Sequence, residues 1–287
     1  MISSAISDSH DASARARLIS LLRGYRSVAV ALSGGVDSGL LLAVARQVLG
    51  RHAVGATGVS PSLSSDELAC AREVALFLEA PLLEIPTHEL DRAEYVANAG
   101  DRCFHCKTEL YGLLTRHPQL EGRVLVDGTH RDDPAGDRPG MRAAIEQGVF
   151  SPLREAGLGK SEIREWAREL GLPNWRRPAR PCLASRIAVG TTVTGDRLAT
   201  VAALESILAE EGFEVYRARL IDQDIVIQLG VGELARGGEQ RWRTRILERA
   251  RALPVARVLF DEAGYQAPGG APPPERRWIE LETGERV

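Results

Sequence analysis

The feature that most constrains the fold is a short polar loop directly after an apolar run. Residues 26–32 (RSVAVAL) have the β-branched and apolar content of a buried strand, and the segment 33–38 (SGGVDS) follows at once. Residues 39–48 then carry apolar side chains at helical spacing. Two glycines between a buried strand and a helix let backbone N–H groups approach an anion at the helix N-terminus. This order favours a phosphate-binding loop over a plain Gly-Gly turn with polar caps.

The polar side chains of the loop fit the same chemistry. Ser33 and Ser38 place hydroxyl donors at its two ends. Asp37 is unfavourable beside phosphates unless a cation lies between them, so its presence predicts Mg²⁺. The nucleotide-binding residues predicted from the loop are Ser33, Gly34, Gly35, Asp37 and Ser38.

The rest of the first half predicts a parallel sheet. Further strands are expected at residues 53–59, 82–85 and 123–126, and a helix at 65–79. Strands that alternate with helices form βαβ units, so we expect an α/β fold with a doubly wound, mostly parallel sheet. Ligands of such sheets bind beyond the carboxyl ends of the strands, which is where the 33–38 loop lies.

The pattern changes after about residue 190 and predicts a smaller C-terminal α+β domain. A helix (195–211) precedes two strands (213–220 and 225–229), an Arg-rich helix (240–252) and a last strand (257–260). The stretch APGGAPPP begins at residue 267 and cannot continue regular structure. The predicted domains are 1–188, 189–266 and a loosely attached tail, 267–287.

Composition bears on the possible partners. The 287 residues carry a net charge of -3, which gives no overall attraction to nucleic acid or to an anionic membrane. The opening residues lack the apolar region of a leader peptide, and no apolar run approaches the length of a membrane span. We therefore expect a cytoplasmic protein without nucleic-acid or membrane partners.

Three of the four cysteines stand in polar, basic surroundings. Cys103 and Cys106 share the motif RCFHCK, and Cys182 lies in RPCLASR. Cys70 lies between alanines in the helix expected at 65–79, and we predict a buried core thiol there. Basic side chains favour thiolates if they approach the sulfurs, and the nearby ones are Arg102, Lys107, Arg180 and Arg186.

Three interpretations of this trio are open. They are simple packing, a zinc site with His88 or His117 as fourth ligand, and a [4Fe-4S] cluster with one free iron. The cluster is favoured because it prefers thiolate ligands, and its open iron can carry an extra sulfide for sulfur transfer. The predicted metal ligands are Cys103, Cys106 and Cys182.

A second glycine-containing segment, 159–161 (GKS), resembles the end of a Walker A loop. The first glycine of that motif would stand at Arg154, and no buried strand precedes the segment. Residues 162–170 have the spacing of an amphipathic helix, so we predict that 159–161 is a helix start.

The loop resembles the PP-loop signature, SGGxDS, of the adenine-nucleotide α-hydrolase superfamily, whose members cleave ATP between the α and β phosphates. Five further motifs narrow the resemblance to the LarE family, the ATP-dependent sulfur transferases of nickel-pincer nucleotide biosynthesis. They are RCFHCKTELY (102–111), VDGTHRDD (126–133), RPGMRAA (138–144), SPLREAGLGKSEIREWARELGLP (151–173) and RPCLASRIAVGTTVT (180–194). The similarity runs from about residue 15 to about residue 260.

This resemblance implies a reaction and its cofactors. ATP·Mg²⁺ adenylates a carboxylate of pyridinium-3,5-biscarboxylic acid mononucleotide, sulfur attacks the activated carbonyl, and AMP leaves. Family members with only the cysteine matching Cys182 give up its sulfur and form dehydroalanine, whereas members with three cysteines hold a [4Fe-4S] cluster and turn over. All three cysteines are present here, which predicts the cluster type. An unknown sulfur donor and a symmetric homo-oligomer, hexamers being among the family's forms, are also implied.

The resemblance assigns roles to individual residues. It implies that the catalytic residues are Cys182, Asp37, Ser185 and Arg186. The nucleotide site extends to Asp127, Gly128 and Thr129, with Asp132 and Asp133 close by. Substrate phosphate binding is implied for Arg142, Arg217, Arg219 and Glu205, and for the last three a solvated surface charge is the open alternative. The chain departs from the family pattern at His130, usually Asn, and at Ala188-Val189, usually Pro-Tyr.

Other functions remain to be weighed. A cluster-dependent tRNA thiolase shares the loop and the cysteines, but the net charge of -3 and the absence of zinc-ribbon cysteines or a basic, aromatic-rich RNA face oppose it. A glutamine-dependent amidotransferase would need a glutaminase domain. A nucleotide sensor that binds ATP without turnover is the alternative from another class, and release of pyrophosphate distinguishes it.

Overall fold

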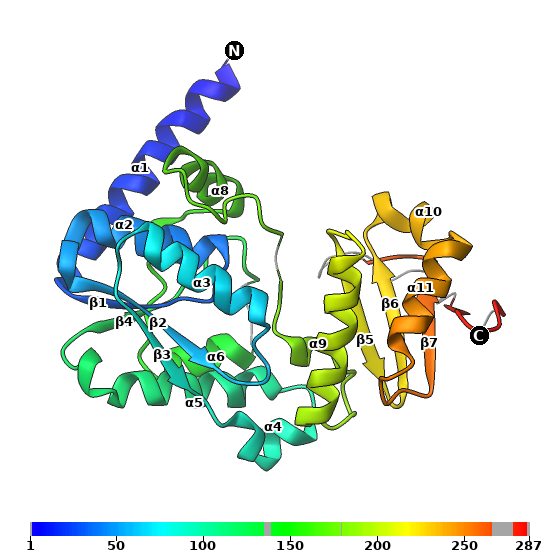
Figure 1. Cartoon of the computed structure of the whole chain (residues 1–287). Helices are drawn as coiled ribbons and strands as arrows, with labels where there is room; N and C mark the ends of the chain where they lie inside the picture. Colours follow the sequence, from blue (N-terminus) through cyan, green and yellow to red (C-terminus); the bar gives the residue numbers. More distant parts are fainter. Residues whose placement is uncertain (1, 135–138, 179, 266–277, 286–287) are drawn as a thin grey trace. The chain divides into compact units, whose positions relative to one another are not determined.

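A computed structural model describes residues 2–134, 139–178, 180–265 and 278–285, with side chains from residue 13 onwards. The chain divides into two compact units (Figure 1). The first comprises Met1–Tyr95 with Asp101–Arg180, and the second comprises Val96–Gly100 with Pro181–Val287. Each unit is described by itself below.

The first unit is built on a four-stranded sheet in the order β3-β2-β1-β4 (Figure 1). All neighbouring strands are parallel, with Val28 opposite Ala53 on one side and Val124 on the other. The strands are β1 (Val28–Ala31), β2 (Ala53–Val59), β3 (Leu82–Pro86) and β4 (Val124–Val126). The predicted parallel α/β sheet is therefore confirmed.

Helices surround this sheet. They are α1 (Ile2–Tyr25), α2 (Val36–Leu49), α3 (Ser65–Phe77), α5 (Arg102–Arg116), α6 (Pro139–Glu146), α7 (Pro152–Ala156) and α8 (Lys160–Glu169). The short helix α4 (Ala93–Ala97) is divided between the units, since Tyr95 belongs to the first and Val96 to the second. Short 3₁₀ turns lie at Gly50–His52, Glu89–Asp91 and Pro118–Leu120. The α1 helix adds to the predicted elements, and its described residues bury a stripe of Ala14, Leu18 and Leu22.

The two faces of β1 belong to two different hydrophobic clusters. Val28 and Val30 pack with α1, α2 and α8, whereas Ala29 packs with α5 and the neighbouring strands. Alternate residues of a strand face opposite sides, so helices cover both faces of the sheet. Cys70 is 1% exposed in the first of these clusters, which confirms the predicted core thiol.

The second unit contains a smaller sheet in the order β5-β6-β7-β8. The strands are β5 (Tyr216–Ile221), β6 (Asp224–Leu229), β7 (Arg257–Asp261) and β8 (Trp278–Glu280), with antiparallel, parallel and antiparallel pairing in that order. Its helices are α9 (Gly195–Glu210), α10 (Leu234–Gly237) and α11 (Gln240–Ala250), with 3₁₀ turns at Leu183–Arg186 and Val231–Glu233.

Two boundaries in this unit differ from the sequence-based expectation. The strand expected from residue 213 begins at Tyr216, because the Glu233 carboxylate accepts hydrogen bonds from the N–H groups of residues 214 and 215. Within the tail expected at 267–287, β8 is a strand of the sheet, with Ile279 buried opposite Phe260. Residues 266–277 of that tail lie outside the described residues.

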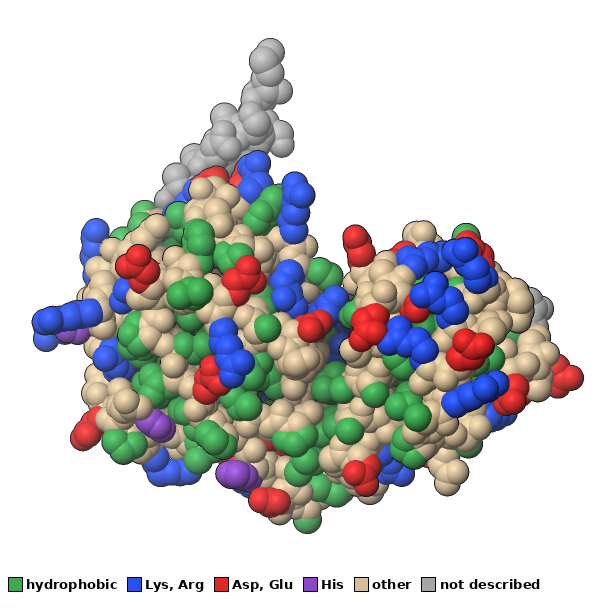
Figure 2. Space-filling model, in the orientation of Figure 1, with side chains coloured by type: hydrophobic (Ala, Val, Ile, Leu, Met, Phe, Trp, Pro, Cys, Tyr) green, Lys and Arg blue, Asp and Glu red, His purple; other side chains and the backbone are tan. Residues whose placement is uncertain are grey.

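Surface charge is mixed. On the face drawn in Figure 2, Lys and Arg side chains lie interspersed with Asp and Glu side chains. In the part of the chain that the structure describes, no helix combines the length and apolar character needed to span a membrane.

Candidate active site

The SGGVDS loop occupies the carboxyl end of β1 and the start of α2. Gly34 has φ +83, and a Cβ there would lie 2.6 Å from the backbone oxygen of Glu67. Only glycine fits this position, because an L side chain would be both strained and blocked by backbone. Gly35 is the N-cap of α2, so Asp37 and Ser38 stand in the first helical turn.

Two serine hydroxyls close the loop on itself. The Ser33 N–H donates to Ser38 Oγ at 3.2 Å, and Ser38 Oγ lies 3.2 Å from the Gly35 carbonyl oxygen. The two hydroxyl oxygens are themselves 3.2 Å apart. Backbone N–H groups at a helix N-terminus and hydroxyls beside them form a surface that suits phosphate oxygens.

The loop after β4 packs directly on this helix start. A Cβ on Gly128 would lie 2.8 Å from the Ser38 nitrogen, so glycine is what allows the two backbones to approach. The adjacent Asp127 is buried and accepts hydrogen bonds from Ser151 Oγ (2.8 Å), Thr129 N (3.1 Å) and Thr129 Oγ1 (3.0 Å). Asp127 therefore fixes the turn that carries Gly128 and Thr129.

Tyr111 of α5 joins the same carboxylate from the other side. Its hydroxyl donates to Asp127 Oδ2 at 3.3 Å. Burial raises the pKa of Tyr111 to about 12, so the hydroxyl keeps its proton and remains a donor.

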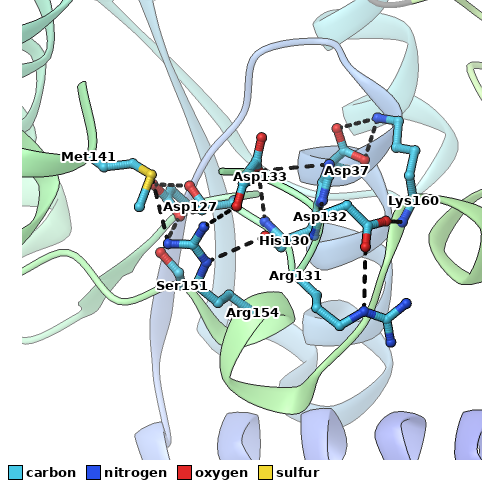
Figure 3. A network of polar contacts seen from close by, with 11 residues as sticks. Asp37, Asp127, His130, Arg131, Asp132, Asp133, Met141, Ser151, Arg154 and Lys160 are labelled. Atoms are coloured by element: carbon cyan, nitrogen blue, oxygen red, sulfur yellow. Dashed lines mark hydrogen bonds and ion pairs between the residues drawn. The ribbon is translucent and has the colours of Figure 1, made fainter. Parts of the chain in front are cut away.

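The Asp37 carboxylate pairs with a lysine that the sequence prediction did not place in the site. Lys160 Nζ lies 2.6 Å from each carboxylate oxygen of Asp37 (Figure 3). Lys160 is the first residue of α8, which confirms the predicted helix start at 159–161. The Gly-Lys pair at a helix start is the one local sequence signal for this lysine. Its long side chain contacts a loop residue that lies 123 positions away in the sequence.

The turn at residues 130–133 belongs to the same network. Asp132 Oδ2 accepts a hydrogen bond from the Lys160 backbone N–H at 2.6 Å, which is the main cause of its lowered pKa. Asp133 Oδ2 accepts from His130 N at 3.0 Å, and Arg154 of α7 donates to the Asp133 carbonyl at 2.7 Å (Figure 3). Arg154 and Ser151 are further residues that support the predicted site.

The first cysteine pair lies on α5. Cys103 is exposed and Cys106 is half-buried, and their spacing of three residues places them on one helical face. A Cβ on Gly140 of α6 would lie 3.9 Å from Cys103 Cβ, so α6 approaches this face closely. Arg142, also on α6, stacks 4.1 Å above the Phe104 ring between the two cysteines.

Lys107 lies between the cysteine pair and the Asp127 network. Its ammonium is 5.3 Å from the centre of the Tyr111 ring. The pKa of Lys107 is raised, first by the electrostatic attraction of Tyr111 and then by Cys106, Asp127 and Cys103. The Lys107 ammonium therefore lies within electrostatic reach of both cysteine side chains and of Asp127.

The third cysteine belongs to the second unit. Cys182 is exposed and stands just before the Leu183–Arg186 turn. Ser185 Oγ donates to the Cys182 carbonyl at 2.7 Å, and Arg186 donates to the same oxygen at 3.0 Å and to the Pro181 carbonyl. The backbone on both sides of the thiol is therefore fixed.

Arg186 is itself held by a buried ion pair. Its Nε and Nη2 donate to the two Glu205 carboxylate oxygens at 2.8 and 3.2 Å, and the Arg186 side chain is 3% exposed. Arg217 is buried beside them, 4.6 Å from the centre of the Tyr265 ring, and burial is the main cause of its lowered pKa. Arg219 is exposed. A solvated surface charge is thus the wrong interpretation for Glu205 and Arg217.

The predicted site residues therefore form groups within each unit. In the first unit, the network of hydrogen bonds and close contacts links the 33–38 loop to residues 127–133, and Arg142 lies by the paired cysteines. In the second unit, Cys182, Ser185, Arg186, Glu205 and Arg217 form one cluster. Among the described residues, no three His, Cys, Asp or Glu side chains are grouped as a metal site. Joint ligation by all three cysteines stays a prediction.

Known proteins place this geometry in a class. The profile of the asparagine synthase family matches residues 15–102, which contain β1, the loop and α2. One component of the glutamine-hydrolyzing GMP synthase of Methanosphaerula palustris is 29% identical over 205 residues, 66% of each chain. A parallel sheet whose first strand enters an SGGVDS loop thus defines an ATP-using PP-loop domain.

Two relatives extend over most of the chain. An uncharacterised protein of Synechocystis sp. (slr1717) is 40% identical over 83% of this chain and 89% of its own length. The pyridinium-3,5-bisthiocarboxylic acid mononucleotide synthase of Lactiplantibacillus plantarum is 31% identical over 89% of this chain and 93% of its own length. The chain belongs to the family of this synthase, the LarE family of PP-loop enzymes.

Proposed function

We propose that this enzyme is an ATP-dependent sulfur transferase of nickel-pincer nucleotide biosynthesis. Its substrate would be pyridinium-3,5-biscarboxylic acid mononucleotide, whose carboxylates become thiocarboxylates. The observation that carries the proposal is the pairing of a PP-loop carboxylate, Asp37, with a partly exposed lysine in one unit, while the other unit presents an exposed, anchored thiol, Cys182. The name and extent of the Lactiplantibacillus relative support the substrate.

The phosphate loop supplies the binding of ATP in this proposal. The N-terminal N–H groups of α2 and the hydroxyls of Ser33 and Ser38 would face the phosphate oxygens. Gly128 and Thr129 would form the opposite wall, held in place by Asp127.

Asp37 fits a Mg²⁺ ligand. Its side chain is 24% exposed and already faces a cation, the Lys160 ammonium. When bound, Mg²⁺ would offset the charge of the phosphates. The Lys160 side chain, 32% exposed, is then free to turn to a phosphate oxygen and to stabilise the pyrophosphate that leaves.

The reaction is an acyl activation followed by substitution. A substrate carboxylate oxygen attacks the α-phosphorus, the bond to the β-phosphate oxygen breaks, and pyrophosphate leaves. A sulfur nucleophile then attacks the acyl carbon, and the carbon–oxygen bond to AMP breaks. An acyl adenylate is a strong electrophile, so this second step needs no additional base once the sulfur is anionic.

The proposed sulfur site consists of Cys103, Cys106 and Cys182. The residues fit a [4Fe-4S] cluster, because such clusters are held by cysteine sulfurs and all three side chains have access to solvent, with Lys107 near two of them. When bound, such a cluster would supply a sulfide as the sulfur that is transferred. Arg186 and Ser185 hold the Cys182 loop, and Lys107 places a positive charge near the two cysteines of α5.

The remaining assignments concern the substrate phosphate and the assembly. Arg217 and Arg219 would bind the phosphate, with Glu205 setting the position of Arg186 beside them. Arg142 would serve the same class of ligand in the first unit, next to Phe104. An unidentified sulfur donor, a homo-oligomeric assembly and a cytoplasmic location complete the proposal.

Iron analysis tests the cluster directly. Protein purified without oxygen should contain about four iron and four sulfide per chain, and a Cys103→Ser, Cys106→Ser double variant should lose them. A Cys70→Ser variant, changed at a buried thiol on α3, should keep the iron. Iron-free wild-type protein whose Cys182 loses the elements of H₂S during turnover would contradict the cluster and show sacrifice of Cys182 instead.

A further inference from the structure

The carbonyl of Gly34, at the centre of the phosphate loop, is held from behind by two side chains. Asn174 Nδ2 donates to the Gly34 oxygen at 2.8 Å, and Cys70 Sγ lies 3.2 Å from the same oxygen. Asn174 comes from the turn after α8, and Cys70 from the inner face of α3. Two segments far apart in the chain thus converge on one peptide group.

The Asn174 side chain is buried although one of its two polar atoms makes no hydrogen bond among the described residues. The side chain is 0% exposed, and its Oδ1 atom has no hydrogen-bond partner among the described residues. A buried polar atom without a partner destabilises a protein, because it has lost its hydrogen bonds to water. The amide orientation follows from its neighbour, since the Gly34 carbonyl accepts and the nitrogen must face it. The hydrogen bond to the Gly34 carbonyl is therefore the structural role of the Asn174 amide.

The surrounding backbone is shaped to admit the amide. A Cβ on Gly39 of α2 would lie 2.9 Å from Asn174 Nδ2. A glycine inside a helix lowers helix stability relative to alanine, and Gly39 is the fourth residue of α2. Gly39 removes the one side chain that would push Asn174 away from the loop.

The direction of the Gly34 carbonyl fixes the direction of the next N–H. In a trans peptide the C=O and N–H bonds point in opposite directions, so an inward Gly34 oxygen turns the Gly35 N–H outward. That N–H makes a long contact of 3.4 Å with Ser33 Oγ, on the exposed side of the loop. Glycine at φ +83 has access to other backbone conformations, and side chains must select this one.

We propose that Asn174, with the Cys70 thiol, is a positioning residue that holds the Gly34–Gly35 peptide with its N–H facing the phosphates of ATP. The inference deepens the proposed function and rests on ATP binding to this loop. Neither side chain touches the nucleotide. They act by preventing a peptide flip that would place a carbonyl oxygen against a phosphate oxygen.

The first test replaces Asn174 by leucine, which has a similar size and donates no hydrogen bond. Calorimetric titration with the α,β-methylene analogue of ATP and Mg²⁺ should show about tenfold weaker binding, the order expected for losing one hydrogen bond and turning a second away. In protein labelled with ¹⁵N-glycine, the Gly35 amide resonance should move before ligand is added. Thr200→Val, which removes a buried hydroxyl donor to a helix carbonyl in the second unit, is the matched control and should change neither readout.

Changes at Cys70 give an independent second measurement if Asn174→Leu does not fold. Cys70→Ala should shift the Gly35 resonance in the same direction and weaken binding by about two- to fivefold, whereas Cys70→Ser keeps a donor and should retain both. An unmoved Gly35 resonance and unchanged affinity in Asn174→Leu or, if that variant does not fold, in Cys70→Ala would overturn the inference. A wild-type protein that binds no ATP analogue would contradict the proposed function instead, and the Gly35 resonance would then still show whether Asn174 holds the Gly34–Gly35 peptide.

Discussion

The phosphate loop and the Cys182 loop are held by ion pairs of opposite character. In the first unit, Asp37 meets Lys160 in a pair whose side chains are 24% and 32% exposed. In the second unit, Arg186 and Glu205 form a pair whose side chains are 3% and 12% exposed. The first pair joins two partly exposed side chains, whereas the second is enclosed and bonded to backbone on both sides.

The difference in burial indicates different roles: the Asp37–Lys160 pair takes part in the reaction, and the Arg186–Glu205 pair holds the structure. A partly exposed ion pair contributes little to stability, so replacing the lysine of such a pair by another cation costs little free energy. A buried pair cannot lose one partner without leaving an uncompensated charge in the interior. We infer that Asp37 changes partners during the reaction, whereas Glu205 keeps Arg186 throughout and so keeps Cys182 in place.

The largest expected effect comes from removing the exchangeable carboxylate. Asp37→Asn should lower the rate of pyrophosphate release by about 10²–10³-fold, because an amide is a poor Mg²⁺ ligand and the leaving group loses charge stabilisation. Stability should change by less than about 1 kcal/mol. Asp66→Asn, which breaks the exposed pair with Arg180 in the same unit, is the control and should leave the rate unchanged. Equal rates for Asp37→Asn and wild type would show that Asp37 has no role in the reaction and would contradict the contrast between the two ion pairs.

Breaking the buried pair should act on stability instead. Glu205→Gln is expected to lower the free energy of unfolding by about 3–5 kcal/mol, because Arg186 remains charged and buried. Lys160→Gln should lower it by less than about 1 kcal/mol. Urea unfolding of the two variants measures both values, and similar losses in the two would show that the pairs do not differ in kind.

A smaller effect is expected where the two backbones of the phosphate site meet. Gly128→Ala places a Cβ 2.8 Å from the Ser38 nitrogen, so the 127–129 turn must move away from α2. ATP affinity should fall by about tenfold, the loss of roughly one well-placed interaction. Gly24→Ala, where a Cβ meets no atom within 4 Å, should leave affinity unchanged. Undiminished affinity in Gly128→Ala would separate this turn from the nucleotide site.

The smallest effect concerns pH. The pKa of Tyr111 is raised from 10.0 to about 12 by burial, so the protonated form is favoured in the folded protein. Its contribution to stability is therefore full below about pH 10 and is lost as the pH rises through about 12. Ultraviolet titration should find a late-ionising tyrosine that disappears in Tyr111→Phe. A Tyr111 that ionises near pH 10 would contradict its burial against Asp127.

Local order in the sequence was sufficient to predict the loop and the sheet. A buried strand, the segment 33–38 and a helix follow one another without a gap, and the parallel neighbours of β1 follow from βαβ alternation. Motif resemblance was needed for Glu205 and Arg217, whose surroundings in sequence look like ordinary surface. Their burial results from packing between α9, the Cys182 loop and β5.

The contacts that complete the phosphate site were beyond prediction from one sequence. Lys160 begins a helix by its local pattern, yet its ammonium lies against a residue 123 positions away. Asn174 resembles a turn residue, and only the fold brings its amide to Gly34. The strand β8 follows a Pro-rich stretch that obscured it, and its pairing with β7 is again a long-range contact. Long side chains and distant pairings carry little local signal.

One measurement tests the central claim, that this PP-loop enzyme activates a carboxylate with ATP in order to replace oxygen by sulfur. Wild-type protein prepared without oxygen is mixed with Mg²⁺, ATP and pyridinium-3,5-biscarboxylic acid mononucleotide, and the nucleotides, pyrophosphate and pyridinium product are followed by mass spectrometry. We expect one AMP and one pyrophosphate for each oxygen exchanged for sulfur, with no exchange in Cys182→Ala. Formation of ADP and phosphate, or AMP without any sulfur in the product, would contradict it.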